Sequence, residues 1–353
     1  MKVNLATNSD VRGHARRLTI VGVLLMIATA ACIGGLTRSA ANAKPPSGPS
    51  SPSLLFSGLG GGSGSTVGPD GALYVTDTVA GRILRVDATS GASTVFADCL
   101  PEQLAAVGLG GPMDVAFIGG TAYALVTLVD ALVGGNDIDG IYRIDGTHSC
   151  TVVADIGAWA LAHPPSGFPF FVPTGVQYAM QPYRGGFLVT DGHHNRVMQV
   201  GLDGSVLAFR SFGDIVPTGL AVHGNTVYMA EAGPVPHLPE NGKIVSFDAK
   251  SSTVTDVASG GRLLVDVEFG RGQTLFALAQ GMFIPGHDPG TPAEPNTGEL
   301  LKVNGNGGFS VVAEALNRPT SLEVIGNTAY VVTLGGQIWK IDNIASPPYG
   351  KGH

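Results

Sequence analysis

Two stretches of this chain, GALYVTDTVAGRILRVD at residues 71–87 and GGFLVTDGHHNRVMQVG at residues 185–201, align without a gap. The alignment places Asp77 in line with Asp191, at the end of the first apolar run. Each stretch reads as an apolar strand, a polar turn and a second strand in which apolar and polar residues alternate. The pattern therefore predicts a β-hairpin that recurs along the chain.

Looser copies of this hairpin occupy residues 121–145, 225–248, 274–304 and 327–342. A short strand-like segment precedes each hairpin, and a β-branched segment follows every hairpin but the last. Units of four short antiparallel strands that repeat about every 40 to 60 residues are typical of β-propellers. The six units predict an all-β fold, a six-bladed β-propeller of four-stranded antiparallel blades over residues 54–343.

The ends of the repeat array predict how the ring closes. The last unit has three strands, whereas the first has a spare apolar segment, Ser53–Leu59, in front of it. We expect this segment to pair with Gln337–Asp342 as the fourth strand of the last blade, because closure leaves only short protected strand edges.

The segment before the propeller predicts export. Three arginines precede an apolar run at residues 18–36, and small residues with an A-x-A pattern follow, which is typical of a cleaved signal peptide over residues 1–43. An uncleaved membrane anchor and a lipoprotein anchor at Cys32 are the alternatives. Residues 44–53 then predict a Pro/Ser-rich tether, and residues 344–353 a C-terminal tail. The mature protein is expected to be secreted, periplasmic or in the cell envelope, without a membrane span.

Charge narrows the classes of partner. The chain carries a formal net charge of −7 at pH 7, and the predicted signal peptide contains more basic than acidic residues, so the mature form is more acidic still. Nucleic acids and anionic lipid surfaces are bound through clusters of Lys and Arg, which the mature chain lacks. We therefore expect that the protein binds no nucleic acid, and we also expect a monomer.

The long loops of the predicted propeller all lie on one face. They comprise three hairpin loops and one link between blades: residues 127–139, 232–241, 280–296 and 156–172. Long loops on one end of a rigid scaffold are where binding usually resides. This face is predicted to bind a small molecule, a glycan or a protein. The aromatic and histidine side chains of these loops are candidate ligand-binding residues: Trp159, His163, Phe171, His237 and His287.

Carboxylates are predicted around the central channel. At one equivalent position of the innermost strands, four blades carry a small residue, namely Gly64, Gly175, Gly219 and Ser321. The other two blades carry Asp114 and Asp266, which should face each other because blades two and five are opposite in a ring of six. All-oxygen ligands suit Ca²⁺ or Mg²⁺, so these two residues are candidate metal ligands for a divalent cation.

Three more carboxylates end the second strands of their blades: Asp77, Asp191 and Glu231. They are candidate ligand-binding residues at the channel mouth. The alternative is that each caps backbone N–H groups in a turn, which Asp does readily.

Two further patterns invite a functional interpretation that the repeat does not favour. His193 and His194 replace Val79 and Ala80 of the first hairpin, so we expect solvated turn residues there rather than metal ligands. Cys99 and Cys150 align with opposite ends of the outer strand, about 20 Å apart along a strand. Because a disulfide needs Cα atoms within about 7 Å, we expect free thiols.

Several motifs together resemble one family. The segments GPDGALYVTD, VPTGV, GGFLVTDGHHNRVMQV, VPTGLAV and VVAEALNRPTSLEV resemble the ScyD/ScyE family of exported propellers, which is related to NHL-repeat proteins. The resemblance covers nearly all of residues 54–342. It implies an exported six-bladed propeller. The family name derives from genes associated with an indolic sunscreen pigment, but most members lie outside that setting and have no settled reaction, so the resemblance implies no single activity.

Binding is therefore the first functional hypothesis. The alternative is a metal-dependent hydrolase similar to the gluconolactonase and strictosidine synthase propellers. In such lactonases an Asn ligand stands where this chain has Thr174-Gly175 and Thr218-Gly219, so a full ligand set is missing. The motifs of serine hydrolases, zinc proteases, P-loop proteins and dinucleotide-binding folds are also missing. The sequence leaves open whether the protein is an enzyme.

Overall fold

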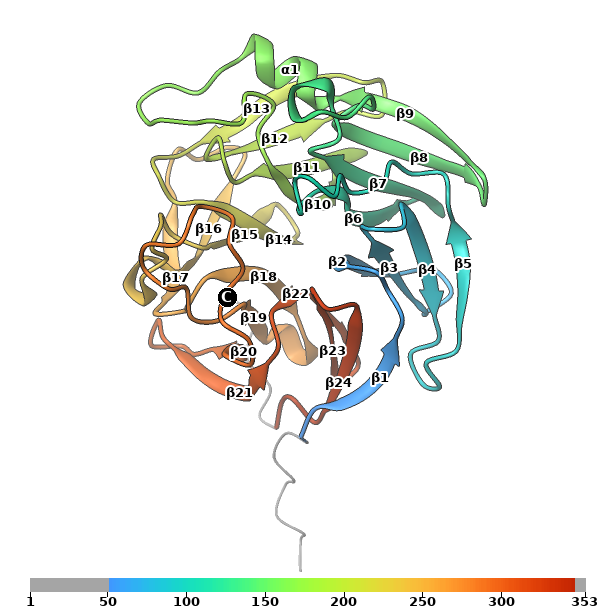
Figure 1. Cartoon of the computed structure of the whole chain (residues 1–353). Coiled ribbons are helices and arrows are strands. Elements are labelled where there is room, and N and C mark those ends of the chain that lie inside the picture. The colour runs from blue at the N-terminus through green and yellow to red at the C-terminus, as the bar shows by residue number, and fades with distance from the viewer. Residues whose placement is uncertain (1–50, 347–353) are drawn as a thin grey trace, which may run out of the picture. The chain divides into compact units, whose positions relative to one another are not determined.

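The computed structural model describes residues 51–346 of the chain. These residues form six four-stranded antiparallel sheets, arranged around a centre that the innermost strand of each sheet faces (Figure 1). The prediction of a six-bladed, all-β propeller is confirmed. The predicted signal peptide, Cys32, most of the predicted tether and most of the predicted C-terminal tail lie outside the described residues.

Each blade is listed from its innermost to its outermost strand. Blade one is β2 (Gly62–Val67), β3 (Leu73–Asp77), β4 (Arg82–Val86) and β5 (Ser93–Ala97). Blade two is β6 (Gly111–Ile118), β7 (Thr121–Thr127), β8 (Gly140–Gly146) and β9 (Ser149–Asp155). Blade three is β10 (Gln177–Tyr183), β11 (Gly186–Asp191), β12 (Arg196–Val200) and β13 (Val206–Ser211).

Blades four to six follow the same order. Blade four is β14 (Pro217–His223), β15 (Thr226–Glu231), β16 (Lys243–Asp248) and β17 (Thr255–Ser259). Blade five is β18 (Leu264–Phe269), β19 (Leu275–Ala279), β20 (Gly298–Val303) and β21 (Phe309–Leu316). Blade six is β22 (Pro319–Ile325), β23 (Thr328–Thr333), β24 (Gln337–Asp342) and β1 (Ser53–Ser57).

The ring closes through its N-terminal strand. β1 pairs antiparallel with β24, with Ser53 opposite Lys340 and Ser57 opposite Gln337. This pairing confirms the predicted closure of blade six. It joins the two ends of the propeller by backbone hydrogen bonds and gives blade six the same number of strands as the other blades.

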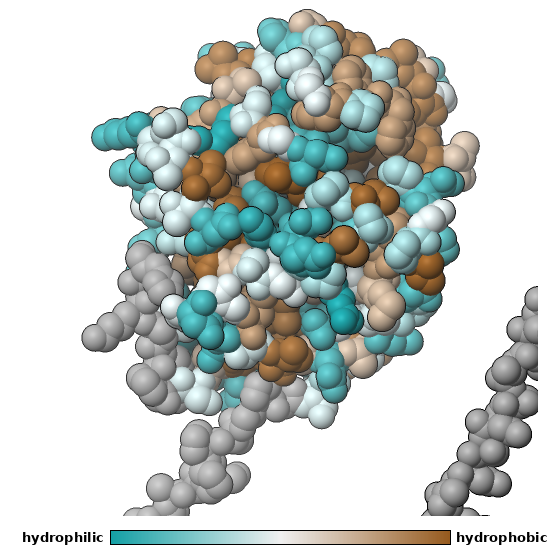
Figure 2. Space-filling view, turned by 90° about the vertical axis from the view of Figure 1, so that its left-hand side faces the viewer, coloured by the Kyte–Doolittle hydropathy of each residue, from teal (hydrophilic) through white to brown (hydrophobic). Residues whose placement is uncertain are grey.

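The second strand of each blade is the most completely buried of its strands. All residues of β3, β11 and β19 are buried, because each strand is covered on both faces by neighbouring blades. Outer strands such as β5 and β13 are largely exposed. On the side of the ring drawn in Figure 2, hydrophobic and hydrophilic side chains are intermixed, as expected when the apolar residues of the strands pack between blades.

One short α-helix occurs among residues 51–346. α1 (Ile156–Ala162) begins the link between blades two and three, and the side chain of Asp155 caps it by accepting a hydrogen bond from the Ala158 N–H. None of the helices in this part of the chain has both the length and the apolar character needed to cross a bilayer.

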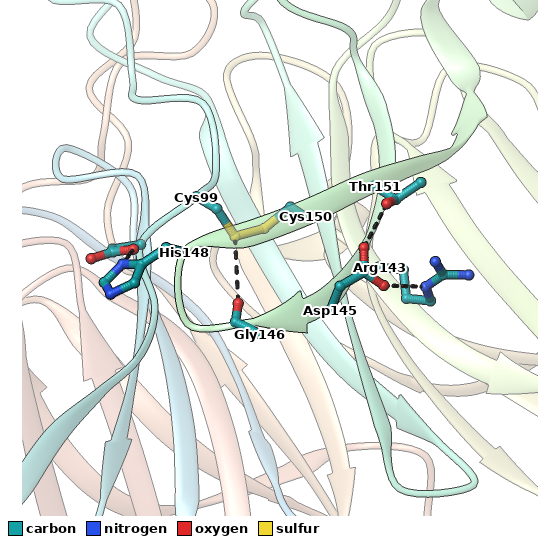
Figure 3. The surroundings of a disulfide bond; sticks show 8 residues. Cys99, Arg143, Asp145, Gly146, His148, Cys150 and Thr151 are labelled. Carbon is teal, nitrogen blue, oxygen red and sulfur yellow. Dashed lines mark hydrogen bonds and ion pairs between the residues drawn. A yellow bond between two sulfur atoms is a disulfide. The ribbon is translucent and has the colours of Figure 1, made fainter.

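The expectation of free thiols is wrong. Cys99 and Cys150 form a disulfide, with their Cα atoms 5.7 Å apart (Figure 3). The chain around them is held by further contacts: the Asp98 N–H donates to the Thr147 carbonyl at 2.8 Å, and the Asp98 carboxylate contacts His148 at 2.7 Å.

The error came from treating the two cysteines as ends of one strand. Cys99 follows β5 of blade one, whereas Cys150 lies in β9 of blade two. Each strand of a blade is rotated by roughly 20–25° from its neighbour, so the outer strand departs strongly from the direction of the inner one. The end of β5 therefore reaches the β8–β9 turn of the next blade, and the disulfide joins two blades.

Candidate functional site

A cavity of about 840 Å³ occupies the centre of the propeller. Its deep wall consists of the inner strands of the blades. Its mouth is formed by hairpin loops and blade links on the face that carries the long insertions. Apolar side chains line much of the mouth: Val107, Leu109, Phe171, Val172, Val235 and Leu263. Carboxylates line the inner strands: Asp114, Asp266, Glu268 and Glu323.

Asp114 and Asp266 occupy matching places in the two halves of the ring. One oxygen of Asp114 accepts from the Val115 N–H at 2.8 Å, and the other accepts from Met180 N–H of blade three at 2.7 Å. Asp266 makes the same contacts with Val267 and with Leu322 of blade six, at 2.8 and 2.7 Å. Each aspartate therefore ties its inner strand to that of the next blade.

Glycines in the preceding blades make room for these aspartates. A Cβ atom on Gly64 would lie 2.6 Å from the Asp114 Cα, and one on Gly219 would lie 2.5 Å from the Asp266 Cα. No real side chain tolerates such an approach to backbone. The small residues that the sequence shows at these ring positions are thus explained by close strand packing beside each aspartate.

The structure corrects the ring position in blade three. The Gly64 N–H donates to the Thr76 hydroxyl at 2.9 Å, and the equivalent contact in blade three runs from Ala179 to Thr190 at 3.0 Å. Ala179, not Gly175, therefore faces the channel at this level. Gly175 lies in a turn before β10 begins. Alignment of the repeats by sequence alone therefore assigned the wrong residue of blade three to this ring position.

Two functional candidates were missed. Glu268 and Glu323 lie two residues after the ring positions of blades five and six, so they point to the same side of their strands one pleat further along. Burial and the nearby Asp266 raise the pKa of Glu268 to about 8. Burial, followed by Glu268, Asp266 and Asp114, raises the pKa of Glu323 well above its usual range. The period-two spacing in LVDVEF and PTSLEV was the signal that could have found them.

The two aspartates share this environment. Burial raises the pKa of Asp266 to about 7, and burial raises the pKa of Asp114 well above its usual range. We call Asp114, Asp266, Glu268 and Glu323 the channel carboxyls. Several of them hold a proton near neutral pH, so that they can donate as well as accept hydrogen bonds.

The raised pKa values of the channel carboxyls predict that the stability of the fold depends on pH. A carboxyl whose pKa is higher in the folded than in the unfolded state holds its proton more tightly when the protein is folded. Its contribution to the free energy of unfolding is therefore full below about pH 4 and is lost as pH rises through about 7 to 8. We expect the free energy of unfolding, measured with urea, to fall between pH 5 and pH 8. Glu268→Gln should flatten this fall, whereas Glu314→Gln on the exposed outer strand should not. Equal slopes in both variants would show that Glu268 does not titrate in this range.

Asp77 and Asp191 do not line the cavity. The Asp77 carboxylate accepts from Gly60 and Gly61 N–H at 2.9 and 3.2 Å and pairs with Arg82 at 2.8 Å. In blade three, the Asp191 carboxylate accepts from the Val176 N–H at 3.1 Å. Both residues cap turns at the ends of their second strands, which is the alternative that the sequence left open.

The expectation of solvated turn histidines is wrong. His194 is buried, and its ring contacts the Val172 carbonyl at 2.9 Å and the Asp191 carboxylate at 3.1 Å. His193 accepts from the N–H groups of Phe171 and Val172 at 2.9 and 3.0 Å, and burial lowers its pKa. Sequence reasoning missed that a long link would fold back over this hairpin. The two histidines hold the part of the link that lines the cavity mouth.

Trp159 and His163 belong to a separate cavity of about 240 Å³. Their rings stack with centroids 4.5 Å apart, and the Arg196 guanidinium lies 4.7 Å from the Trp159 ring centroid. Arg196 also donates to the His163 carbonyl at 2.6 Å. These contacts fix the link on blade three and leave both residues away from the central cavity.

Of the remaining candidate ligand-binding residues, two line the central cavity and two do not. Phe171 is 68% exposed at the mouth, and the buried His237 also lines the cavity, with its Nδ1 atom 2.7 Å from the Gly233 carbonyl. His287 packs near the Phe283 ring outside the cavity lining. Glu231 is buried outside the lining as well, and burial raises its pKa to about 7.

The channel does not present a ready divalent-cation site. Within residues 51–346, no group of three or more His, Cys, Asp or Glu side chains is placed to hold a metal ion. All four carboxylate oxygens of Asp114 and Asp266 already accept backbone N–H groups, and burial favours protonated carboxyls. The donor set of these two residues fits a clamp between blades rather than a resident Ca²⁺ or Mg²⁺.

Comparison with known proteins shows the fold. No family model and no curated protein sequence matches this chain. A gluconolactonase from Xanthomonas campestris is 13% identical with a TM-score of 0.57, covering 82% of this chain and 89% of that one. Regucalcin from Agrobacterium tumefaciens, a calcium-binding protein, is 12% identical with a TM-score of 0.53, covering 81% and 92%.

A third similar structure is the PQQ-bound aldose sugar dehydrogenase from Streptomyces coelicolor. It is 14% identical with a TM-score of 0.51, and the match covers 84% of this chain and 99% of that one. At this level of identity the shared property is the propeller, and these proteins differ in what they bind or convert. The function of this chain therefore has to be argued from its own cavity.

Proposed function

We propose that this protein binds a small organic molecule in the central cavity, with a hydrogen-bond-donating end on the channel carboxyls and an apolar body against the mouth. The observation that carries the proposal is the continuity of one cavity from the apolar loop residues to the four carboxyls. In this proposal the protein is exported and monomeric, as the sequence predicts, and the resemblance to the ScyD/ScyE propellers agrees with it.

The size and lining of the cavity define the class of ligand. Its volume of about 840 Å³ falls in the range of about 300 to 1,000 Å³ that is usual for small-molecule sites. Carboxyls with raised pKa values bind an ammonium group when they ionise, and they bind sugar or alcohol hydroxyls in either form. A small cation or polyol with an apolar group, or the end of a glycan, matches this lining. A protein partner would contact only the loops of the mouth.

A second candidate function is acid–base catalysis, in line with the hydrolase alternative. Asp266 and Glu268 lie on one face of β18, and burial raises their pKa values to about 7 and about 8. Two neighbouring carboxyls that titrate near neutral pH can serve as general base and general acid. Hydrolysis of small esters or lactones with a bell-shaped pH profile, lost in Glu268→Gln, would favour this function.

The binding proposal is tested with a panel of small amines and polyols that carry an aromatic or aliphatic group. We expect members of the panel to raise the melting temperature of the wild-type protein. A bound ammonium group favours the ionised form of Glu323, and a hydrogen bond to a charged group contributes about 1.5–3 kcal/mol, so Glu323→Gln should weaken the binding of the amines by about tenfold or more. Glu314→Gln, an exposed control on β21, should bind as the wild type does. Unchanged affinity in the double variant Glu268→Gln with Glu323→Gln would contradict the proposal.

A further inference from the structure

A second group of buried oxygens lies outside the central cavity, between the blade-two loop and the link to blade three. Three side-chain oxygens there are buried and have no hydrogen-bond partner among the described residues: Asp130 Oδ2, Asp139 Oδ2 and Thr174 Oγ1. Buried polar atoms in proteins are almost always paired, so three such atoms in one place call for an explanation.

The three residues are brought together by different parts of the chain. Asp130 precedes η1 (Ala131–Val133), and Asp139 ends the same loop just before β8. Thr174 lies in the link, a few residues before β10. Only Asp130 is partly exposed, whereas Asp139 and Thr174 are 1% and 2% exposed. Both the Asp130 and the Thr174 side chains lie within interaction distance of the Asp139 carboxyl.

The other oxygen of each aspartate is already used. Asp139 Oδ1 accepts from the Val129 N–H at 2.9 Å, and Asp130 Oδ1 accepts from the Leu132 N–H at 2.6 Å. These contacts orient both carboxylates, so that the remaining oxygens have fixed positions. No ion pair of residues 51–346 involves either carboxylate.

We propose that Asp130, Asp139 and Thr174 bind a divalent cation of the Ca²⁺ or Mg²⁺ type. Two carboxylates beside each other in a buried place repel, and a hard cation with oxygen ligands offsets this repulsion. The hydroxyl of Thr174 supplies a third oxygen, and the partly exposed side of Asp130 admits water to complete the coordination. This donor set has no nitrogen or sulfur, which disfavours zinc and copper.

The bound cation would fasten the cavity mouth. Val133 of η1 and Val172 of the link both line the central cavity, and each lies close in sequence to one of the proposed ligands. A cation that joins the blade-two loop to the link holds both walls in place. This site is separate from the channel carboxyls and does not depend on the proposed ligand.

Isothermal titration of metal-free protein with Ca²⁺ alone, and separately with Mg²⁺ alone, tests the site. We expect one site per chain and a higher melting temperature with the cation that binds. Asp139→Asn and Thr174→Val should each weaken binding by about tenfold or more, in the range seen when a supporting contact of a metal site is lost. Asp137→Asn, which removes an exposed carboxylate from the same loop, should leave affinity unchanged.

Two outcomes would overturn the inference. The first is that neither cation binds the wild type and neither raises its melting temperature. The second is that binding persists in Asp139→Asn and Thr174→Val and is lost in the double variant Asp114→Asn with Asp266→Asn, which would place the cation in the channel. The proposed function is judged separately, by the amine and polyol panel and Glu323→Gln.

Discussion

Replacing Cys99 and Cys150 with serine is expected to lower the free energy of unfolding by about 4 kcal/mol, from the chain entropy of a disulfide that closes a loop of this length. The two cysteines are 51 residues apart and join blades one and two at their outer edges. The outer strands there are largely exposed, so few buried contacts replace the covalent link. Urea unfolding of the oxidised wild type and of the double variant measures the loss.

Reduction provides the matched control. Reducing agent should destabilise the wild type by a similar amount and leave the double serine variant unchanged. Thiol titration of the denatured, non-reduced protein without residues 1–43, and therefore without Cys32, gives an independent measurement, for which we expect no free thiol. Two reactive thiols in that protein would restore the expectation from the sequence and refute the disulfide.

Asp191→Ala is expected to cost about 3–5 kcal/mol of stability, because it leaves a buried guanidinium without its partner. The Asp191 side chain is fully buried, and the side chain of its partner Arg196 is 5% exposed. Asp191 also accepts from the N–H groups of Val176 and His194, both at 3.1 Å, so its loss frees two buried donors as well. Chemical denaturation measures the change.

Blade one contains the natural control for this prediction. Asp77 is equally buried, but the side chain of its partner Arg82 is 31% exposed and can be solvated. Asp77→Ala should therefore cost less than Asp191→Ala. The double variant Asp191→Ala with Arg196→Met should recover part of the loss, because it removes the unpaired charge. Equal costs at the two positions, without recovery, would show that the buried ion pair is not the cause.

The fold was predictable because its signal is repeated. Each hairpin alternates apolar and polar residues in the same way, and six imperfect copies support one another. The spare strand Ser53–Leu59 could also be assigned, since only one blade lacked its fourth strand. Blade twist was not readable from a linear alignment, and this is why Cys99 and Cys150 were placed far apart.

The site was predictable only in part. Asp114 and Asp266 were placed correctly in the channel, because ring positions follow from the repeat. The register of blade three was shifted, since the inner strand there begins later than the alignment indicated. The roles of His193 and His194 depend on how the long link folds back over the hairpin, which no local pattern encodes. Loops without periodicity carry little information about their contacts.

The most direct test of the central claim is a crystal structure of the protein with the tightest binder from the amine and polyol panel. We predict that its hydrogen-bond-donating end lies within hydrogen-bond distance of Glu268 or Glu323, with its apolar body beside Phe171 and Val235. A binder found in the smaller cavity beside Trp159, or on the face opposite the long loops, would contradict the account. So would a panel in which nothing binds the wild type.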